Sequence, residues 1–462
     1  MAQGDIRALG KEVAAGNFED ARLTRRLERI VERVAENPSL SLPKAMSVAE
    51  LEGAYRFFSN ARVVPGRILA PHIEATRRRC EALGRVLILH DTTDFSYRPD
   101  GEREGLGRCI ASKQTFFAHF SLALSADGLR RPLGVVGLKT WARGDSPKGG
   151  ERARWLAQAN VVREALGPNV RRVHVMDREA DDFEVLSGMA AMGEGFIVRA
   201  KHNRWLDLVE GEERTRLREV VSRTEVAVQR EAALTRRHAP RSPTKAKIHP
   251  ARKARLTQLS LSVTRVTLPC TGCAQKAGNL GEPLTLNVVR AWEPDPPEGE
   301  VAVEWLLLTN EPVETTEALE ACVDAYRARW TIEEYFKALK TGCSFELRQL
   351  HDYEGLVNAL AVFATVAYHV LLIRSEARRA PDAEPLLIIT PEQIEVLRVL
   401  GRRPLPEAPT NRDIMLAVAA LGGHIKYAPD PGWQTLAFGY NKLTTLTEGW
   451  MAAKLQPPCD QR

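Results

Sequence analysis

The spacing of apolar residues changes along the chain, and it first indicates helices. Between residues 20 and 38 the apolar positions recur at helical spacing, which predicts an amphipathic helix that begins after Asp20 and ends before Pro38. Its apolar stripe is Leu23, Leu27, Ile30, Val31 and Val34. Its opposite face carries Arg22, Arg25, Arg26, Arg29 and Arg33. A basic face of this kind either contacts a nucleic-acid backbone or is simply solvated, and both interpretations stay open.

From about residue 84 the apolar positions form short runs that are typical of strands. These runs are RVLILHD (85–91), FFAHFSLALS (116–125), RRPLGVVGLKTW (130–141), RRVHVMD (171–177) and GFIVRAKH (195–202). A helical pattern over 151–167 lies between the third and fourth runs. The β-β-β-α-β order predicts an α/β sheet. Two of the strands end on aspartates, Asp91 and Asp177, at the edge of the sheet where ligand sites concentrate.

The pattern changes again between about 205 and 300. Alternating apolar runs at 256–268 and 284–292 follow a strongly basic stretch, 236–255, and we interpret the region as an inserted β-rich subdomain with a basic loop. WLLLT (305–309) then returns to the core sheet, and the chain from about 345 is mainly helical. The apolar run at 356–373 is interrupted by Asn358 and His369, so it predicts a buried core helix and no membrane span.

Length and composition limit the class of protein. A chain of 462 residues is too long for one compact core, so we expect two to four domains. The patterns above divide the chain into a helical region over 1–75, an α/β core over 76–375 and a helical region over 376–462. A hydrophobic fraction of 44% with 27% charged residues is typical of a soluble globular protein. The net charge is only +6, so a polyanionic partner would be bound by local basic patches. Seven scattered cysteines favour a reducing compartment, the cytoplasm.

One helical stretch, 326–340, combines several kinds of chemistry. Tyr326, Arg329, Glu333 and Lys340 have the spacing of residues on one face of an α-helix. A carboxylate beside two cations and a phenol suits a metal ion next to a phosphate. A solvated surface with ion pairs between neighbouring turns is the alternative, and the spacing does not decide between them.

Glu333 can be combined with the two strand-end aspartates, Asp91 and Asp177. Phosphodiester cleavage requires an activated oxygen nucleophile and a neutralised leaving oxygen, and two divalent ions supply both. Magnesium takes oxygen ligands and retains water, so a few carboxylates from separate elements suffice. Arg329 and Lys340 would then hold phosphates, and Tyr326 would stack or donate a hydrogen bond. We interpret the nearby Asp94, Asp181 and Asp182 as surface or supporting groups.

These motifs resemble those of a known family. HDTTDFSY (90–97), MDREADDFE (176–184) and the helical signature Tyr-x2-Arg-x3-Glu-x6-Lys at 326–340 are similar to those of bacterial insertion-sequence DDE transposases, more narrowly the insertion-sequence-four group that includes the transposon-Tn-five transposase. The resemblance extends to GAYRFFSN (53–60) and to residues 421–450. It implies a ribonuclease-H-like core with a β-rich insertion, a helical N-terminal domain that binds the transposon end, and C-terminal helices that form a homodimer contact.

The resemblance also assigns roles to residues. It implies that Asp91, Asp177 and Glu333 are catalytic and hold Mg²⁺, for which Mn²⁺ can substitute. It implies that Tyr326, Arg329 and Lys340 grip DNA phosphates beside a flipped base. Trp305 would fill the space that the base vacates, Arg199 would contact the same DNA end, and Arg56 in the N-terminal region would read DNA. These DNA-binding residues are Tyr326, Arg329, Lys340, Trp305, Arg199 and Arg56.

The implied reaction is cut-and-paste transposition of double-stranded DNA. Water first nicks one strand at the element's end, and the freed 3′-hydroxyl attacks the opposite strand to form a hairpin. A second water molecule then opens the hairpin, and the 3′-hydroxyl finally joins target DNA. One site would perform every step, because each is a displacement at phosphorus by oxygen. Two alternatives remain: a DNA-binding inhibitor or regulator of transposition that does not cut, and a structure-directed nuclease that cuts without joining strands.

Overall fold

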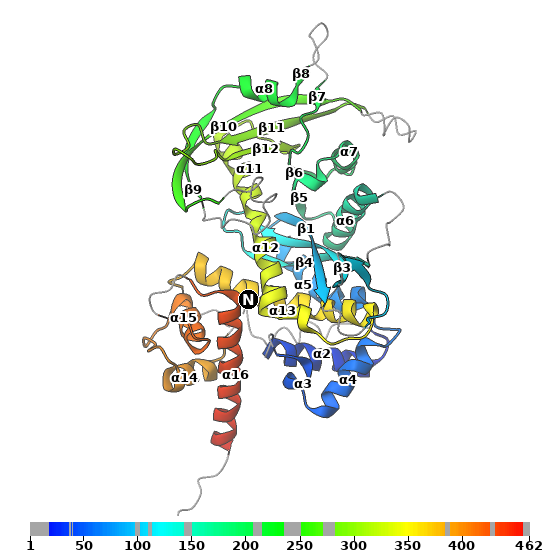
Figure 1. Ribbon diagram of the computed structural model, residues 1–462, viewed down its shortest axis with the longest axis vertical. Helices are drawn as coiled ribbons and strands as arrows, with labels where there is room; N and C mark the ends of the chain where they lie inside the picture. The colour runs from blue at the N-terminus through cyan, green and yellow to red at the C-terminus, as the bar shows by residue number, and fades with distance from the viewer. Residues whose placement is uncertain are drawn as a thin grey trace, which may run out of the picture.

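The computed structural model describes most of the chain (Figure 1). The described residues are 18–36, 38, 40–97, 102–109, 113–142, 150–206, 215–234, 251–270, 282–383, 389–425 and 430–455. The larger part of the predicted basic loop, residues 235–250, lies outside them.

A ten-stranded mixed sheet forms the centre of the described structure. Its strands run in the spatial order β2-β3-β1-β5-β6-β12-β11-β10-β9, and β4 pairs with β3. Their bounds are β1 Arg85–Tyr97, β2 Gly107–Cys109, β3 Lys113–Ser125, β4 Pro132–Ala142, β5 Arg171–Met176, β6 Gly195–Arg199, β9 Val228–Leu234, β10 Arg255–Leu268, β11 Leu284–Trp292 and β12 Glu304–Thr309. The pairs β1–β5 and β5–β6 are parallel and the other pairs are antiparallel. The predicted mixed α/β class is confirmed.

The strands of the region 205–300 continue this sheet. β12 pairs with β6 on one side and with β11 on the other, so β9, β10 and β11 extend the core sheet through β12. A separate two-stranded sheet, β7 Trp205–Leu206 with β8 Thr215–Arg216, lies beside α8 Leu217–Arg223. In Figure 1 this β-rich part forms the upper end of the molecule. The insertion therefore adds strands in hydrogen-bonded register with the core.

β1 is longer than the sequence predicts. The prediction that it ends on Asp91 is wrong, because it runs on to Tyr97. The parallel register with β5 stops at Leu89, but the antiparallel register with β3 continues to Tyr97 opposite Gln114. The polar residues after Asp91 are thus held in the strand by a partner that is distant in sequence.

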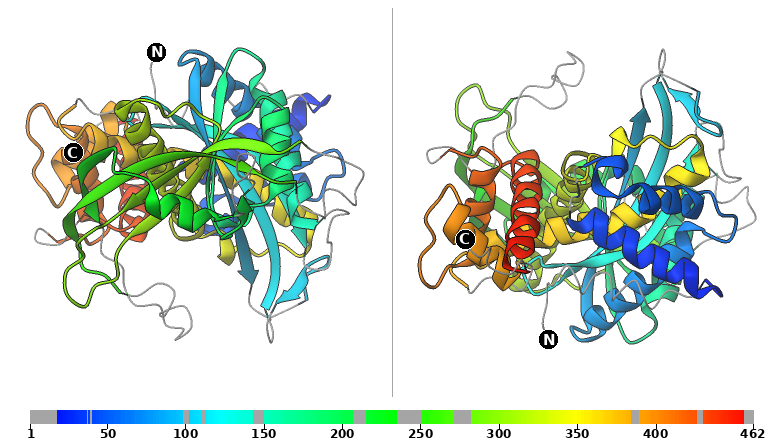
Figure 2. Two further views of the ribbon diagram at one scale, coloured as in Figure 1. Left: turned by 90° about the horizontal axis from the view of Figure 1, so that it is seen from above. Right: turned by 90° about the horizontal axis from the view of Figure 1, so that it is seen from below.

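Helices occupy both ends of the chain. The N-terminal ones are α2 Ala21–Glu36, α3 Leu42–Ala45, α4 Val48–Phe58 and α5 Pro65–Glu81, and the C-terminal ones are α14 Pro391–Leu400, α15 Asn411–Leu421 and α16 Trp433–Leu455. Seen from below, the two groups lie at the same end of the molecule, away from β9–β11 (Figure 2). The apolar stripe predicted for 20–38 is the buried face of α2, with Leu27, Ile30, Val31 and Val34 inside the core. The predicted domain boundaries at 75 and 376 both lie inside helices, α5 and α13.

α13, Tyr353–Arg379, is the central helix. By length and composition it could span a membrane, but 83% of its most apolar window is buried inside the protein. It packs against α2, α4, α5 and β4. It is therefore a core helix, as its polar interruption predicts. The remaining helices are α6 Gly150–Leu166, α7 Phe183–Ala191, α11 Thr316–Ala328 and α12 Trp330–Lys337, with short turns η2 Arg178–Ala180, η3 Ala338–Gly342 and η4 Phe345–Leu347.

Asn358 on α13 links the N-terminal helices to the core by hydrogen bonds. Its buried side-chain amide donates hydrogen bonds to the carbonyls of Phe58, at the end of α4, and Val63, before α5, each at 3.0 Å. Both carbonyls lie where a helix ends or has not begun, so the Asn358 amide helps to satisfy them. The polar residue inside the apolar run therefore joins two regions of the chain.

We predict that Asn358→Leu lowers the free energy of unfolding by about 2 kcal/mol, because it leaves two buried carbonyls without these donors while it keeps the number and branching of the side-chain heavy atoms. Chemical denaturation measures the change. Thr365→Val is the control: its hydroxyl bonds only the Val362 carbonyl of its own helix, so the loss is below about 1 kcal/mol. Equal stability of the wild type and Asn358→Leu would contradict this role.

Candidate active site

The pairing of β1 with β5 places two aspartates side by side. Leu89 is the last β1 residue in parallel register with β5, opposite Val175. Asp91 and Asp177 each lie two residues farther along, so the same register brings their backbones next to each other at one edge of the sheet. The Asp91 carboxylate accepts a hydrogen bond from the Thr92 amide at 2.8 Å. Two acidic groups from distant segments therefore share one surface.

The segment after β5 holds Asp177 and its neighbours in place. Asp177 caps the short turn η2 by accepting from the Glu179 amide at 2.8 Å, and Asp182 caps α7 through the Glu184 amide. Asp181 is buried and accepts hydrogen bonds from the backbone amides of residues 201 and 202 and from Arg204. Asp181 is thus no surface group. It anchors the chain that follows β6.

The stretch 326–340 is not one regular α-helix. α11 ends at Ala328, Arg329 lies at the junction, α12 follows, and η3 is a π-helical turn that contains Lys340. The amide of Arg329 bonds the carbonyl of Tyr326, and the amide of Ile332 bonds that of Arg329, which tightens the chain at the junction. The prediction that one regular α-helix carries all four residues is therefore wrong in detail. Turns of the π type, such as the one that contains Lys340, frequently occur at functional sites.

Buried side chains hold α12 against the core. Ile332 and Tyr335 are buried, and the Tyr335 hydroxyl donates to the Ala364 carbonyl of α13 at 3.0 Å. The Tyr335 ring also contacts Phe120 of β3 edge-on at 5.4 Å. Glu333, between these two anchors, is held beside β1 because its helix cannot turn without unpacking them.

Arg329 joins the acidic residues. Its guanidinium donates to Asp91 and to Glu333, each at 2.9 Å, and its side chain is 15% exposed. Asp177 also interacts electrostatically with Arg329 and with Asp91. Within the described ranges no three acidic, histidine or cysteine side chains converge closely enough to hold an ion without rearrangement. The structure thus brings Asp91, Asp177 and Glu333 to one place, with an arginine between two of them.

Burial and neighbouring charges shift the pKa values of several of these side chains. Burial raises the pKa of Asp91, and the Asp177 charge adds to that rise, while Arg329 opposes it. Burial likewise raises the pKa of Glu333, with a further rise from Asp91. Burial disfavours the charge on Arg329, but Asp91, Tyr326 and Glu333 together raise its pKa. The site therefore concentrates negative charge that needs a cation, and clustered perturbed carboxylates are typical of functional sites.

A second cluster lies beside the carboxylates, where β6, β12 and α11 meet. Arg199 interacts with the Tyr326 hydroxyl and donates to the Glu304 carbonyl at 3.3 Å. The Trp305 and Tyr326 ring centroids are 6.3 Å apart. Burial lowers the pKa of Arg199, and Tyr326 partly offsets the effect. Three of the predicted DNA-binding residues are therefore neighbours.

Of the other three predicted DNA contacts, Arg329 lies between Asp91 and Glu333, and Lys340 and Arg56 lie apart from the cluster. Lys340 faces β1: its ammonium is 3.7 Å from Asp94 and 5.3 Å from the Phe95 ring centroid. Arg56 projects from α4, with its side chain 74% exposed and 3.7 Å from Glu52. The structure does not bring Arg56 to the carboxylates.

A buried polar chain under Asp91 was not expected from the sequence. His90 Nε2 bonds His174 Nδ1 at 2.7 Å, His174 bonds Glu194 at 3.1 Å, and Ser121 bonds His90 at 3.1 Å. Burial holds the pKa of His90 well below its usual range, so this imidazole is neutral. The chain links β1, β3 and β5 beneath the two aspartates. The signal in the sequence was a histidine at an inward position of each apolar run, RVLILHD and RRVHVMD.

Family models match two parts of this chain. Residues 7–63 match the family described as transposase DNA-binding, and residues 84–368 match the transposase DDE domain. Among solved structures, the piggyBac transposase synaptic complex with hairpin DNA, determined by cryo-EM, is similar at a TM-score of 0.40 and 10% identity, over 99% of this chain and 83% of that chain. A likeness at that level carries no argument about function. The DDE-domain match covers more than half of the sequence and contains every carboxylate of the site, and the chain therefore belongs to the DDE transposase family.

Proposed function

We propose that this chain is a cut-and-paste transposase of the insertion-sequence-four, transposon-Tn-five-like group, which cleaves its element's ends through a hairpin and joins them to target DNA. The observation that carries the proposal is the ion-paired set at the sheet edge, in which Arg329 bridges Asp91 and Glu333 next to Asp177. Asp91, Asp177 and Glu333 are the proposed catalytic triad. An enzyme that cleaves DNA can use carboxylates gathered at one place to hold the metal ions that take part in the cleavage.

The residues of the triad suit a divalent cation. They offer only carboxylate oxygens, the ligands that Mg²⁺ and Mn²⁺ prefer. Burial, and to a smaller degree a neighbouring carboxylate, raises the pKa of Asp91 and of Glu333, and a dication would favour their charged forms. Bound Mg²⁺ would supply an activated oxygen nucleophile and neutralise the leaving oxygen. Asp91 lies on β1, Asp177 directly follows β5 and Glu333 lies on a packed helix, so the donors would be held by rigid elements.

Arg329 changes partners in this proposal. In the structure its guanidinium forms ion pairs with Asp91 and Glu333. A dication among the carboxylates would compete with it, and a DNA phosphate would offer the guanidinium an equally good bidentate acceptor. Arg329 would therefore leave the carboxylates as metal and DNA arrive.

The cluster of Arg199, Trp305 and Tyr326 supports the hairpin route. A hairpin requires strong distortion of the DNA end, and extruding a base costs a few kcal/mol of stacking that aromatic side chains can offset. Trp305 and Tyr326 lie close together beside the triad, with Arg199 to hold a phosphate. We further propose that Lys340 contacts a phosphate on the β1 side and that Arg56 contacts DNA from the N-terminal helices.

The wider organisation belongs to the same proposal. The core over 76–375 would cut and join DNA, residues 1–75 would bind the transposon end, and the helices of 376–462 would form the homodimer contact in a synaptic complex. We place the protein in the cytoplasm, with the nucleoid, where its free thiols Cys80, Cys322 and Cys343 stay reduced.

The direct test incubates the protein with DNA that carries its own element's ends and Mg²⁺, and separates the products on denaturing gels. Hairpin ends followed by joined target DNA are the expected result. Binding without cleavage would indicate a regulator of transposition, and cleavage that ignores the end sequence and joins no strands would indicate a nuclease.

Asp177→Asn should abolish cleavage, by a factor of at least about 10³, and leave end binding nearly unchanged, because it removes a metal ligand and no phosphate contact. Asparagine also caps turns, so η2 should persist. Gel-shift and cleavage assays measure the two effects. Asp295→Asn, in an exposed loop, is the charge-matched control. Substantial cleavage by Asp177→Asn would show that the triad is misassigned.

Arg329→Gln should raise the Mn²⁺ affinity of the DNA-free protein about tenfold or more, because it removes a competing charge from Asp91 and Glu333. Titration calorimetry or Mn²⁺ electron paramagnetic resonance measures this affinity without any need for cleavage. Arg327→Gln is the control, since Arg327 pairs with Asp324 instead. Unchanged Mn²⁺ affinity in Arg329→Gln would exclude the exchange of partners.

Lys340→Ala should weaken the DNA complex and reduce the slope of log affinity against log salt by about 0.9, the value for one phosphate contact. Fluorescence anisotropy at several salt concentrations measures it. Lys454→Ala, which removes a lysine paired with Glu395 near the C-terminus, should leave the slope as it is. If Lys340→Ala does the same, Lys340 lies away from the DNA.

A further inference from the structure

A buried chain of hydrogen bonds lies under the strands that carry the aspartates, and the proposed reaction leaves it without a role. Successive side chains of a strand alternate between its two faces, so His90 points away from the face that carries Asp91. The centroid of the His90 ring lies 5.0 Å from that of His174, on which it is stacked, and 6.2 Å from that of Trp155 on α6. We propose that the hydrogen bond between these two histidines fixes the separation of Asp91 and Asp177, and that both histidines are positioning residues for the metal site.

The backbone pairing of β1 with β5 does not extend as far as the aspartates. Their parallel register ends at Leu89 opposite Val175, two residues before each aspartate. His90 is the first residue of β1 past this register, and its Nε2 bonds Nδ1 of His174 on β5 at 2.7 Å. The side-chain bond therefore continues the connection between the two strands up to the residue that precedes Asp91.

The chain has one consistent order of donors and acceptors. Burial disfavours the charge on Glu194, but hydrogen bonds from His174 and Arg172 lower its pKa to about 2, so it is ionised and only accepts. Burial lowers the pKa of both histidines, so each ring is neutral, with one donor and one acceptor. His174 Nε2 therefore donates to Glu194 at 3.1 Å, and its Nδ1 accepts from His90. His90 Nδ1 in turn accepts from the Ser121 hydroxyl at 3.1 Å.

Both ends of the chain are attached to other elements. The Gln158 amide of α6 donates to Ser121 of β3 at 2.9 Å, and Arg172 of β5 donates twice to Glu194, each time at 2.8 Å. Gln158, Ser121 and Glu194 are buried, and a buried polar group that loses its partner is unfavourable, so each link holds the next. Hydrogen bonds also depend on direction, and a fully satisfied buried network specifies one arrangement more sharply than apolar contacts do.

The separation of the aspartates matters because a dication holds its ligands at fixed distances. Mg²⁺ requires nearly ideal octahedral geometry, with oxygen ligands at about 2.1 Å. Groups that orient the ligands without touching the ion commonly change metal affinity by about 10- to 100-fold. The positioning role rests on the proposed function in one respect, that the two aspartates hold a divalent cation, and it is independent of the hairpin route and of the DNA contacts.

The experiment measures Mn²⁺ binding to the full chain without DNA by electron paramagnetic resonance, under conditions in which circular dichroism shows each variant to be folded. His90→Leu removes the donor to His174 and should weaken Mn²⁺ binding about tenfold. His90→Gln keeps an amide donor near the place of Nε2 and should bind Mn²⁺ within about threefold of the wild type. Ser121→Ala is a smaller change that only releases the His90 ring, and it should weaken Mn²⁺ binding about threefold even if His90→Leu does not fold.

A matched control separates positioning from general loss of stability. His72 on α5 is also buried, and it accepts a hydrogen bond from the Val135 amide of β4 at 3.0 Å, outside this chain. His72→Leu should lower the free energy of unfolding and leave the Mn²⁺ affinity of the folded protein unchanged.

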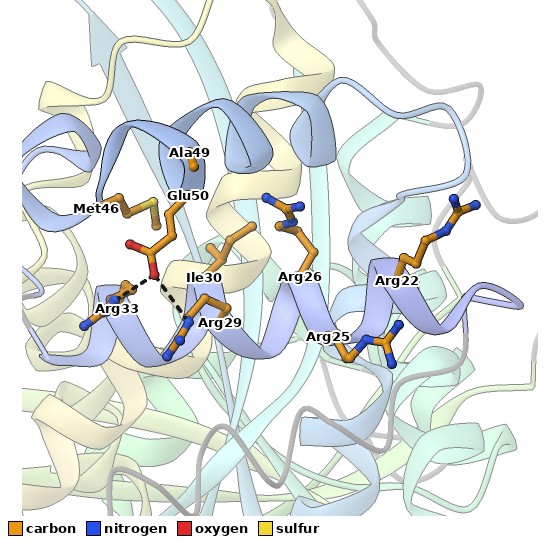
Figure 3. A pocket seen from close by; sticks show the side chains of 9 residues that line it. All are labelled: Arg22, Arg25, Arg26, Arg29, Ile30, Arg33, Met46, Ala49 and Glu50. Carbon is orange, nitrogen blue, oxygen red and sulfur yellow. Dashed lines mark hydrogen bonds and ion pairs between the residues drawn. The ribbon is translucent and has the colours of Figure 1, made fainter.

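A second control concerns DNA binding. Arg26 is one of the five arginines along α2 that Figure 3 shows. Arg26→Ala should weaken binding of a fluorescein-labelled duplex without metal and leave the Mn²⁺ affinity unchanged. His90→Leu should do the reverse, because its side chain lies between the sheet and α6.

The outcomes separate this role from the proposed function. Wild-type Mn²⁺ affinity in Ser121→Ala and in folded His90→Leu would overturn the positioning role. Equal losses in His90→Leu and His90→Gln would overturn it as well, because the hydrogen bond would not be their cause, and so would an equal loss in His72→Leu. If the wild type binds no Mn²⁺, or Asp177→Asn binds it as tightly as the wild type, the metal site itself is misassigned and the proposed function fails together with this role.

Discussion

The burial of Asp91 and Glu333 beside Arg329 is the constraint on which this site depends. Asp91 and Asp177 are placed together by parallel strand register, and α12 adds Glu333 beneath a partly buried surface. Burial alone disfavours these charges, and each additional one raises the cost for its neighbours. Arg329 offsets part of this cost through its ion pairs with Asp91 and Glu333. The site is therefore stabilised as an ion-paired cluster, and in the function proposed above a divalent cation would take the place of the arginine.

The continuous sheet also places Trp305 and Arg199 beside the carboxylates. β12 pairs with β6, so Trp305 and Arg199 are fixed by the same backbone hydrogen bonds that hold the core strands together. Tyr326 approaches them from α11, one turn before Arg329. The carboxylates and the aromatic cluster are therefore both attached to one continuous sheet.

Local sequence signals predicted much of the fold and part of the site. The helical stripe of α2 and the runs of β3, β5 and β6 are properties of neighbouring residues, so periodicity sufficed to predict them. The extension of β1 past Asp91 depends on β3, and the break at Arg329 contains neither glycine nor proline, so both arise from tertiary contacts that the sequence does not display. The proximity of Asp91 to Asp177 follows from the order of the strands. The approach of Arg329 to Asp91, 238 residues away, does not. The roles of the triad and of the DNA contacts stay predictions.

The π-turn at η3 has a consequence for changes in chain length. Such a turn contains one residue more than an ordinary helical turn, so deletion of one residue between 338 and 342 would convert it to regular α-helix without breaking the path of the chain. The cost would be a rotation of about 100° for the side chain at that point. The loss of a single codon there would thus redirect the Lys340 side chain while sparing the fold, so the direction of this lysine can change without a change elsewhere in the chain.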